Sequence, residues 1–315
     1  MTAETVARLY RGVYRIRRME EEIARLYPSD KIKSPVHLSI GQEAVSVAVC
    51  DALRADDVVF GTYRSHALYL AKGGDARKMM AELYGKVTGC AKGKGGSMHL
   101  IDAAAGVMGT SAVVGSTIPL AVGYAYARRL RRESGIVVSF FGDGATEEGV
   151  FDESLNFARL HRLPILFVCE NNFYAIHAHQ RTRQPLDNIC ERAAGHGIPA
   201  ERLEDDVLAL HARALDAVGN VRAGGGPCFF ECMVYRWKEH VGPGDDFHLG
   251  YRTEEEAAPW KARDQVARLA AMLDPAVRSR VEADVEAGIT DAIDFAEASP
   301  FPDEMDLYAD VLKEV

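Results

Sequence analysis

Two short runs of consecutive apolar residues, separated by a helical segment, constrain the fold of this chain more than any other feature. Residues 136–141 and 165–169 are apolar at nearly every position, as is typical of parallel strands that are covered on both faces. The segment between them, about 149–160, has the periodicity of a helix. Together they predict a βαβ unit, and therefore a mainly parallel sheet with helices on both faces.

Further helices and strands are predicted around this unit. Helices are expected at residues 4–27, 40–53, 75–84, 115–132 and 207–218, and strands at 58–60 and 228–235. Ser39 and Gln42 predict a capping box for the helix at 40–53. The helix at 115–132 is mostly apolar, so we expect it to be buried. The pattern predicts one doubly wound α/β domain that spans residues 1–315.

The C-terminal segment, residues 257–315, is predicted to be a helical extension of that domain. Apolar residues recur there at every fourth position and form one stripe on a helix: Val277, Val281, Val285, Ile289 and Ile293. This stripe is expected to pack either on the domain or against a partner.

The composition limits the partners and the location of the chain. Its formal net charge is −9, which disfavours nucleic acid because phosphate binding needs a basic surface. No apolar stretch approaches the roughly 20 residues of a membrane span, and the N-terminus has no secretory pattern. We therefore expect no membrane partner and a cytoplasmic location.

Polar motifs directly follow the two buried strands. Gly142, Asp143 and Gly144 come after the first strand, and Asn171 and Asn172 come after the second. The carboxyl ends of parallel strands meet at one edge of a sheet, where ligands bind in such folds. A carboxylate and an amide oxygen suit Mg²⁺, which keeps positions free for phosphate oxygens. Either motif alone could be an ordinary turn or loop, but together they predict a metal–diphosphate site.

The two motifs and their spacing resemble the thiamine diphosphate motif. Four further stretches resemble the alpha subunit of the decarboxylating component of 2-oxo acid dehydrogenases, such as pyruvate dehydrogenase: HLSIGQEAV at 37–45, TYRSHA at 62–67, GCAKGKGGSMHL at 89–100 and YRTEEE at 251–256. The resemblance covers nearly the whole chain. It implies the thiamine-diphosphate-binding fold, thiamine diphosphate and Mg²⁺ as cofactors, and a small 2-oxo acid as substrate.

The same resemblance implies roles for individual residues. Asp143 and Asn172 are expected to bind the metal through their side chains, and Tyr174 through its backbone carbonyl. The expected cofactor contacts are Tyr63, Arg64, Ala112, Val114, Asp143, Gly144, Ala145, Asn172, Ile176 and His240, with Arg64 pairing a phosphate. His37 and His240 are the expected catalytic residues, facing the reactive carbon or its substrate, where a histidine can move protons.

The resemblance also implies partners. In this family the glutamate that activates the aminopyrimidine ring belongs to a beta subunit, so this chain is expected to be inactive alone and to form an α2β2 heterotetramer. A lipoyl acyltransferase is a further expected partner, because the acyl unit passes to an acceptor such as a lipoyl group.

The chain departs from the family pattern around His240. Relatives that use pyruvate typically read His-Gly-His-Ser there, whereas this chain reads Lys238-Glu239-His240-Val241. Val241 and His179 also replace serines that some relatives phosphorylate. The identity of the substrate therefore stays open, and the alternatives are an acetoin-cleaving enzyme or a split transketolase-like subunit. A non-enzymatic nucleotide-binding module is disfavoured because no G-x-G-x-x-G opens a strand–helix unit.

Overall fold

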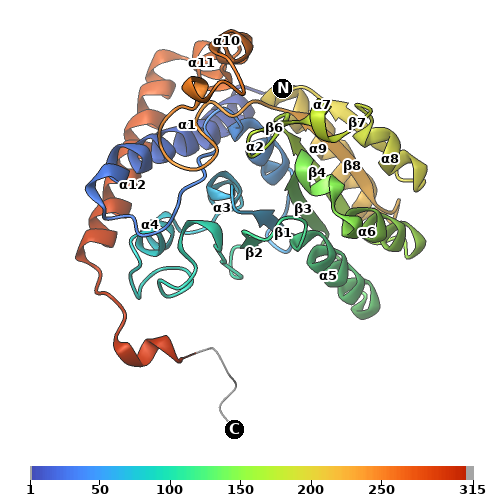
Figure 1. Cartoon of the computed structure of the whole chain (residues 1–315), viewed down its shortest axis with the longest axis horizontal. Coiled ribbons are helices and arrows are strands. Elements are labelled where there is room, and N and C mark those ends of the chain that lie inside the picture. The colour runs from blue at the N-terminus through green and yellow to red at the C-terminus, as the bar shows by residue number, and fades with distance from the viewer. Residues whose placement is uncertain (1, 310–315) are drawn as a thin grey trace.

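The computed structural model describes residues 2–309, so Met1 and residues 310–315 of the expected domain lie outside the described residues. A six-stranded sheet forms the centre of the molecule, with the strand order β2-β1-β3-β4-β8-β7 (Figure 1). All neighbouring strands in it are parallel. The strands are β1 Val58–Thr62, β2 Val107–Ser111, β3 Val137–Gly142, β4 Ile165–Asn171, β7 Ala200–Leu203 and β8 Cys228–Met233.

Helices cover both faces of this sheet, which confirms the predicted α/β class. One face carries α1 (Ala3–Leu26), α2 (Glu43–Asp51) and α9 (Val207–Arg222), and the other carries α5 (Thr117–Arg131), α6 (Gly149–Leu160) and α8 (Ile189–Gly195) (Figure 1). Alternate side chains of β3 therefore enter different cores. Val138 and Phe140 pack in the core beneath α1 and α2, whereas Val137 and Phe141 pack in the core beneath α5 and α6.

The remaining elements are shorter or lie towards the chain end. They are α3 (His66–Ala71), α4 (Ala76–Leu83), the antiparallel pair β5 (Tyr174–Ala175) and β6 (Ala178–His179), α7 (Gln180–Arg183), α10 (Glu254–Ala262), α11 (Gln265–Ala271) and α12 (Pro275–Ala298). The C-terminal part is therefore helical, as predicted. Within residues 2–309, no helix combines the length and the apolar character needed to cross a membrane.

The apolar stripe on α12 packs on the domain itself. Val281, Val285 and Ile289 are buried in the core that α1 shares. Tyr10 on α1 donates a hydrogen bond of 2.6 Å to Glu282, and so anchors the polar edge of the same contact. Val277 is the exception, with 39% of its surface exposed. Of the two expected packing modes for this stripe, the structure shows core packing.

Two local predictions were wrong. The capping box does not form, because Gly41 has φ = +93° and keeps residues 40–42 out of the helix, which begins at Glu43. The helix near 115–132 is not buried on all sides, since Leu120 and Leu130 are 59% and 66% exposed. Only its opposite face packs on the sheet.

Candidate active site

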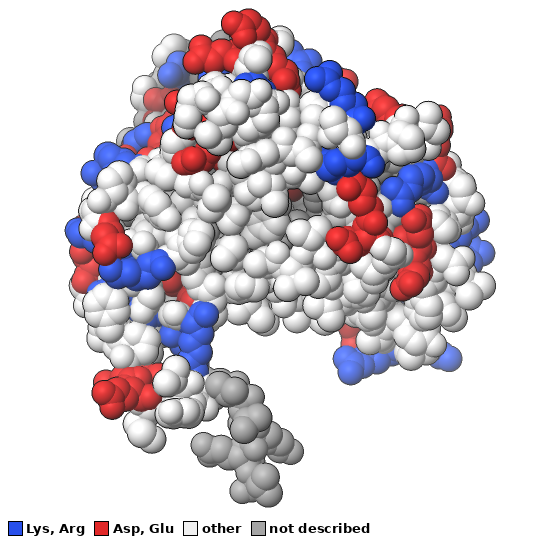
Figure 2. Space-filling model, in the orientation of Figure 1, with Lys and Arg blue, Asp and Glu red and all other residues white. Residues whose placement is uncertain are grey.

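A cavity of about 270 Å³ lies at the carboxyl edge of the sheet, where β1, β3 and β4 end. Its lining includes the ends of these strands and the loops that follow them. Figure 2 shows that the central surface on this side of the molecule is mostly uncharged, with charged side chains gathered towards the periphery. The position is the one expected for a ligand site in an open α/β sheet.

The two motif loops lie side by side in this cavity. β3 and β4 pair in register up to Gly142 and Glu170, so Asp143 and Asn172 both follow directly at the same edge. Asp143 is almost fully buried, and Asn172 is 8% exposed. The side-chain oxygen of Asn172 accepts a hydrogen bond of 3.1 Å from the backbone N–H of Tyr174, which holds the second loop in a tight turn.

Asp143 has a partner that the sequence did not indicate. Arg183, at the end of α7, donates hydrogen bonds to the carboxylates of Asp143 and Glu147. Burial raises the pKa of Asp143, and the positive charge of Arg183 opposes that rise. The carboxylate that was expected to bind the metal thus has a counter-cation from the chain itself.

Arg64 brings a positive charge to the other side of the cavity. Its guanidinium donates hydrogen bonds to the backbone oxygens of Leu38, at 2.8 Å, and His240, at 3.0 Å. Burial lowers its pKa to about 10, so it stays charged at neutral pH. Both acceptors are neutral, so the charge is left available to an anion in the cavity.

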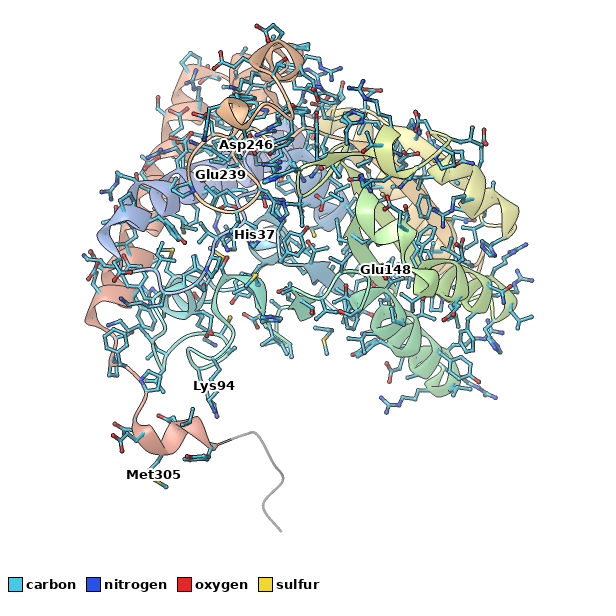
Figure 3. The ribbon with its side chains drawn as sticks, in the orientation of Figure 1. His37, Lys94, Glu148, Glu239, Asp246 and Met305 are labelled. Carbon is cyan, nitrogen blue, oxygen red and sulfur yellow. The ribbon has the colours of Figure 1, made fainter. Side chains whose placement is uncertain are left out.

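His37, Tyr63 and His240 form one aromatic cluster beside Arg64. The His37 ring lies 4.5 Å from the Tyr63 ring and 5.2 Å from the His240 ring, measured between centroids. The pKa of both histidines is lowered to about 3, mainly by burial and secondly by the charge of Arg64. Both imidazoles are therefore neutral at pH 7. Tyr63 and His240 line the cavity, whereas His37, labelled near the centre of Figure 3, is not part of its wall. Within residues 2–309, His37 Nδ1 is buried with no hydrogen-bond partner.

The other predicted residues mostly line the same cavity. Val114, Gly144, Ala145, Tyr174 and Ile176 are all part of its wall. Gly144 is required by close packing, since a Cβ there would lie 2.8 Å from the Cβ of Ala175. Ala112 is not in the wall, although its neighbours Ser111 and Val113 are.

Among the lining residues that were not predicted from the sequence, four have an amide or carboxyl side chain: Gln42, Glu147, Glu148 and Glu170. Glu148 lies towards α6 in Figure 3. Burial raises the pKa of Glu170 to about 8. Glu170 could have been found, because it directly precedes the Asn-Asn motif at the end of a predicted buried strand.

The loop that contains His240 is held in place by a buried aspartate that pairs with two arginines. Asp246 accepts hydrogen bonds from Arg236, at 3.0 Å, and from Arg252, at 2.6 Å. These three side chains are at most 2% exposed. Asp246 thus orders the segment that differs most from the family pattern.

Comparison with known proteins places these features in a family. Residues 11–304 match the model of the dehydrogenase E1 component. The alpha subunit of the acetoin:2,6-dichlorophenolindophenol oxidoreductase of Bacillus subtilis is 36% identical over 99% of this chain and 94% of its own length. The pyruvate dehydrogenase E1 component subunit alpha of Zymomonas mobilis is 37% identical over 98% of this chain and 89% of its own length.

The parallel sheet, the cavity at its carboxyl edge and these matches define an oxidoreductase subunit of the thiamine-diphosphate-dependent class. More closely, the chain belongs to the dehydrogenase E1 component family, as an alpha subunit of the 2-oxo acid dehydrogenase type. The resemblance noted in the sequence is confirmed.

Proposed function

We propose that this chain supplies the diphosphate half of a thiamine diphosphate site and, with a beta subunit, decarboxylates a 2-oxo acid. The observation that carries the proposal is the convergence of Asp143, Asn172 and Arg64 on one cavity. A metal–diphosphate group fits this arrangement, with a carboxylate and an amide oxygen on one side of the cavity and a guanidinium cation on the other.

The metal would be Mg²⁺, held by the side chains of Asp143 and Asn172 and by the backbone carbonyl of Tyr174. Among residues 2–309, no group of three or more His, Cys, Asp or Glu side chains could hold a metal ion. A single carboxylate with neutral oxygens fits Mg²⁺, which takes its remaining ligands from water and phosphate.

Each residue group of the site would have a distinct task. Thiamine diphosphate, when bound, would supply the carbanion chemistry and the electron sink that decarboxylation of a 2-oxo acid requires. Arg64 would hold a phosphate, Val114 and Ile176 would pack against the cofactor, and Tyr63 would support the His37–His240 pair. Because both imidazoles are neutral at pH 7, each would offer the substrate one N–H that donates a hydrogen bond and one ring nitrogen that accepts one.

The physiological substrate is proposed to be a 2-oxo acid, with acetoin as the second candidate. A 2-oxo acid is favoured by the relatives that are named as pyruvate dehydrogenase alpha subunits. Acetoin is favoured by the Bacillus subtilis relative and by the altered segment around His240. A panel of 2-oxo acids and acetoin, assayed with an artificial electron acceptor on the assembled enzyme, would separate the two.

The assembly is proposed to be an α2β2 heterotetramer in the cytoplasm that passes its acyl unit to a lipoyl acyltransferase. The relatives are named as alpha subunits, which supports a beta partner. We also propose that residues 1–315 are one domain with 257–315 as its extension, since α12 shares a core with α1 and α4.

The experiment that tests this proposal is a calorimetric titration of the αβ complex with thiamine diphosphate. Binding is expected with Mg²⁺ and to be lost with a chelator. Asp143→Ala is expected to weaken binding by about 100-fold or more without loss of folding, because a metal ligand is gone. Glu153→Ala, at an exposed position on α6, is the control. Wild-type-like affinity in Asp143→Ala would contradict the metal assignment.

A further inference from the structure

Arg183 lies between two carboxylates of the active site. Its guanidinium pairs with Asp143 and with Glu147, and its Nε donates a hydrogen bond of 2.9 Å to the backbone oxygen of Ala178. The side chains of Arg183 and Asp143 are 11% and 1% exposed. The contact with Asp143 is therefore a largely buried ion pair, and three acceptors fix the orientation of the Arg183 guanidinium.

The helix that carries Arg183 also connects the two motif loops. Asn171, beside Asn172, donates a hydrogen bond of 3.1 Å to Gln180, and Gln180 donates one of 2.9 Å to Gln184. Gln184 in turn donates to Thr146, at 3.1 Å, in the loop that follows Asp143. This chain of amides is buried. It ties α7, at the upper right of Figure 1, to the two motif loops.

A nearby cation stabilises a buried carboxylate, because an uncompensated charge is unfavourable away from water. In the cofactor-free chain that cation is Arg183. In the loaded site the metal would bring two positive charges to the same carboxylate. Arg183 and the metal therefore either pair with Asp143 one after the other or compete for it.

We propose that Arg183 is a positioning residue that holds the Asp143 side chain in one orientation until the metal binds, and that it competes with the metal for this carboxylate. The inference rests on the proposed function, because it takes Asp143 as a metal ligand. It assigns Arg183 a role that neither Arg64 nor the histidines can fill, since it alone among these pairs with Asp143.

The proposal predicts opposite effects in the free and the loaded states. Without Arg183, Asp143 and Glu147 lose their shared cation, so the metal-free complex should become less stable. The same loss leaves a more negative site, so a divalent cation alone should bind several-fold more tightly. Saturating metal and cofactor should restore most of the lost stability. A merely structural ion pair would contribute equally in both states.

The test uses the αβ complex with Arg183→Gln and with Arg181→Gln, an exposed arginine of the same helix, as the matched control. Thermal midpoints are measured without ligands and with saturating Mg²⁺ and thiamine diphosphate. The affinity for Mn²⁺ alone is measured by electron paramagnetic resonance. We expect Arg183→Gln to lower the thermal midpoint of the free complex by roughly 3 °C. The midpoint of the loaded complex should differ little from that of the loaded wild type. The variant should bind Mn²⁺ more tightly than the wild type does. Arg181→Gln should match the wild type throughout.

Arg183→Lys keeps a charge and provides a second variant if Arg183→Gln assembles poorly. Its thermal midpoint should fall by less than half as much as that of Arg183→Gln. If Arg183→Gln does not assemble, Arg183→Lys should still do so. An equal loss in free and loaded states, or weaker Mn²⁺ binding by the variants, would overturn the role of Arg183. Failure of the wild-type complex to bind Mg²⁺ and thiamine diphosphate would instead contradict the proposed function.

Discussion

At the scale of single residues, the position of His240 separates its role from cofactor binding. Its backbone oxygen accepts the shorter hydrogen bond from Arg64, at 3.0 Å, while its ring contacts His37 and Tyr63 and has Nδ1 3.4 Å from the Arg64 guanidinium. Substitution of the side chain leaves the backbone contact in place. The ring should therefore matter for proton transfer more than for the hold on the diphosphate.

We predict that His240→Ala lowers kcat of the assembled enzyme by roughly 100-fold, the scale of a lost acid–base group. The affinity for thiamine diphosphate should change little. His248→Ala is the matched control, because His248 lies in the same segment and its side chain is 70% exposed. Steady-state kinetics and calorimetry measure both quantities, and unchanged turnover would show that His240 is structural.

Glu170 should make stability depend on pH. Its pKa rises from 4.5 to about 8 through burial, so between these values the native state keeps a proton that the unfolded state has lost. Stability from this group is present below pH 4.5 and is lost as the pH rises through 8. Glu170→Gln stays neutral, and its thermal midpoint should rise relative to wild type by roughly 2 °C or more at pH 8.5.

The same comparison at pH 5 should show little difference between Glu170→Gln and wild type. Glu153→Gln, at an exposed site, should follow the wild type at both values. Parallel curves for Glu170→Gln and wild type across this range would mean that Glu170 ionises normally in the folded chain.

At the scale of elements, Asp246 orders the segment around His240. It is the shared acceptor of two buried arginines, Arg236 and Arg252. Asp246→Ala would leave both cations without it, which typically costs about 3–5 kcal/mol for a buried pair. We predict faster hydrogen exchange across residues 238–250 and a loss of activity through a displaced His240.

Asp245→Ala is the control for this change, because the neighbouring Asp245 side chain is 66% exposed. Its exchange pattern should match that of the wild type. If Asp246→Ala also leaves the exchange of residues 238–250 unchanged, the arginines do not order this segment through Asp246.

Elements with a long, consistent pattern could be predicted from the sequence. The unit of β3, α6 and β4 is apolar or periodic throughout, and the structure has it at nearly the predicted bounds. β2 and β7 were missed because both are short, β2 contains a glycine, and β7 is an edge strand with two charged residues. Such strands owe their conformation to a paired neighbour more than to their own residues.

The site shows the same division. Residues directly after predicted strands could be placed at one edge, because the topology of a parallel sheet requires it. Arg183 could not be placed, since its contact with Asp143 spans 40 residues and depends on the β5–β6 pair. That pair has two residues in each strand and no apolar alternation that would reveal it.

At the scale of the whole molecule, exposed apolar side chains at the mouth of the cavity indicate that a second subunit covers it. Val113, Val114 and Ile176 border it and are 66%, 46% and 57% exposed. Apolar side chains at a cavity mouth are typical of a surface that another protein covers. The carbanion chemistry of the cofactor also needs a site from which water is excluded.

The central claim is that this chain holds half of an active site. The most direct test is decarboxylation of 2-oxo acids by the purified chain with Mg²⁺ and thiamine diphosphate, measured before and after addition of its beta subunit. We expect no turnover by the chain alone, and activity that appears with the beta subunit and saturates near an equimolar ratio. Robust turnover by the chain alone would contradict it.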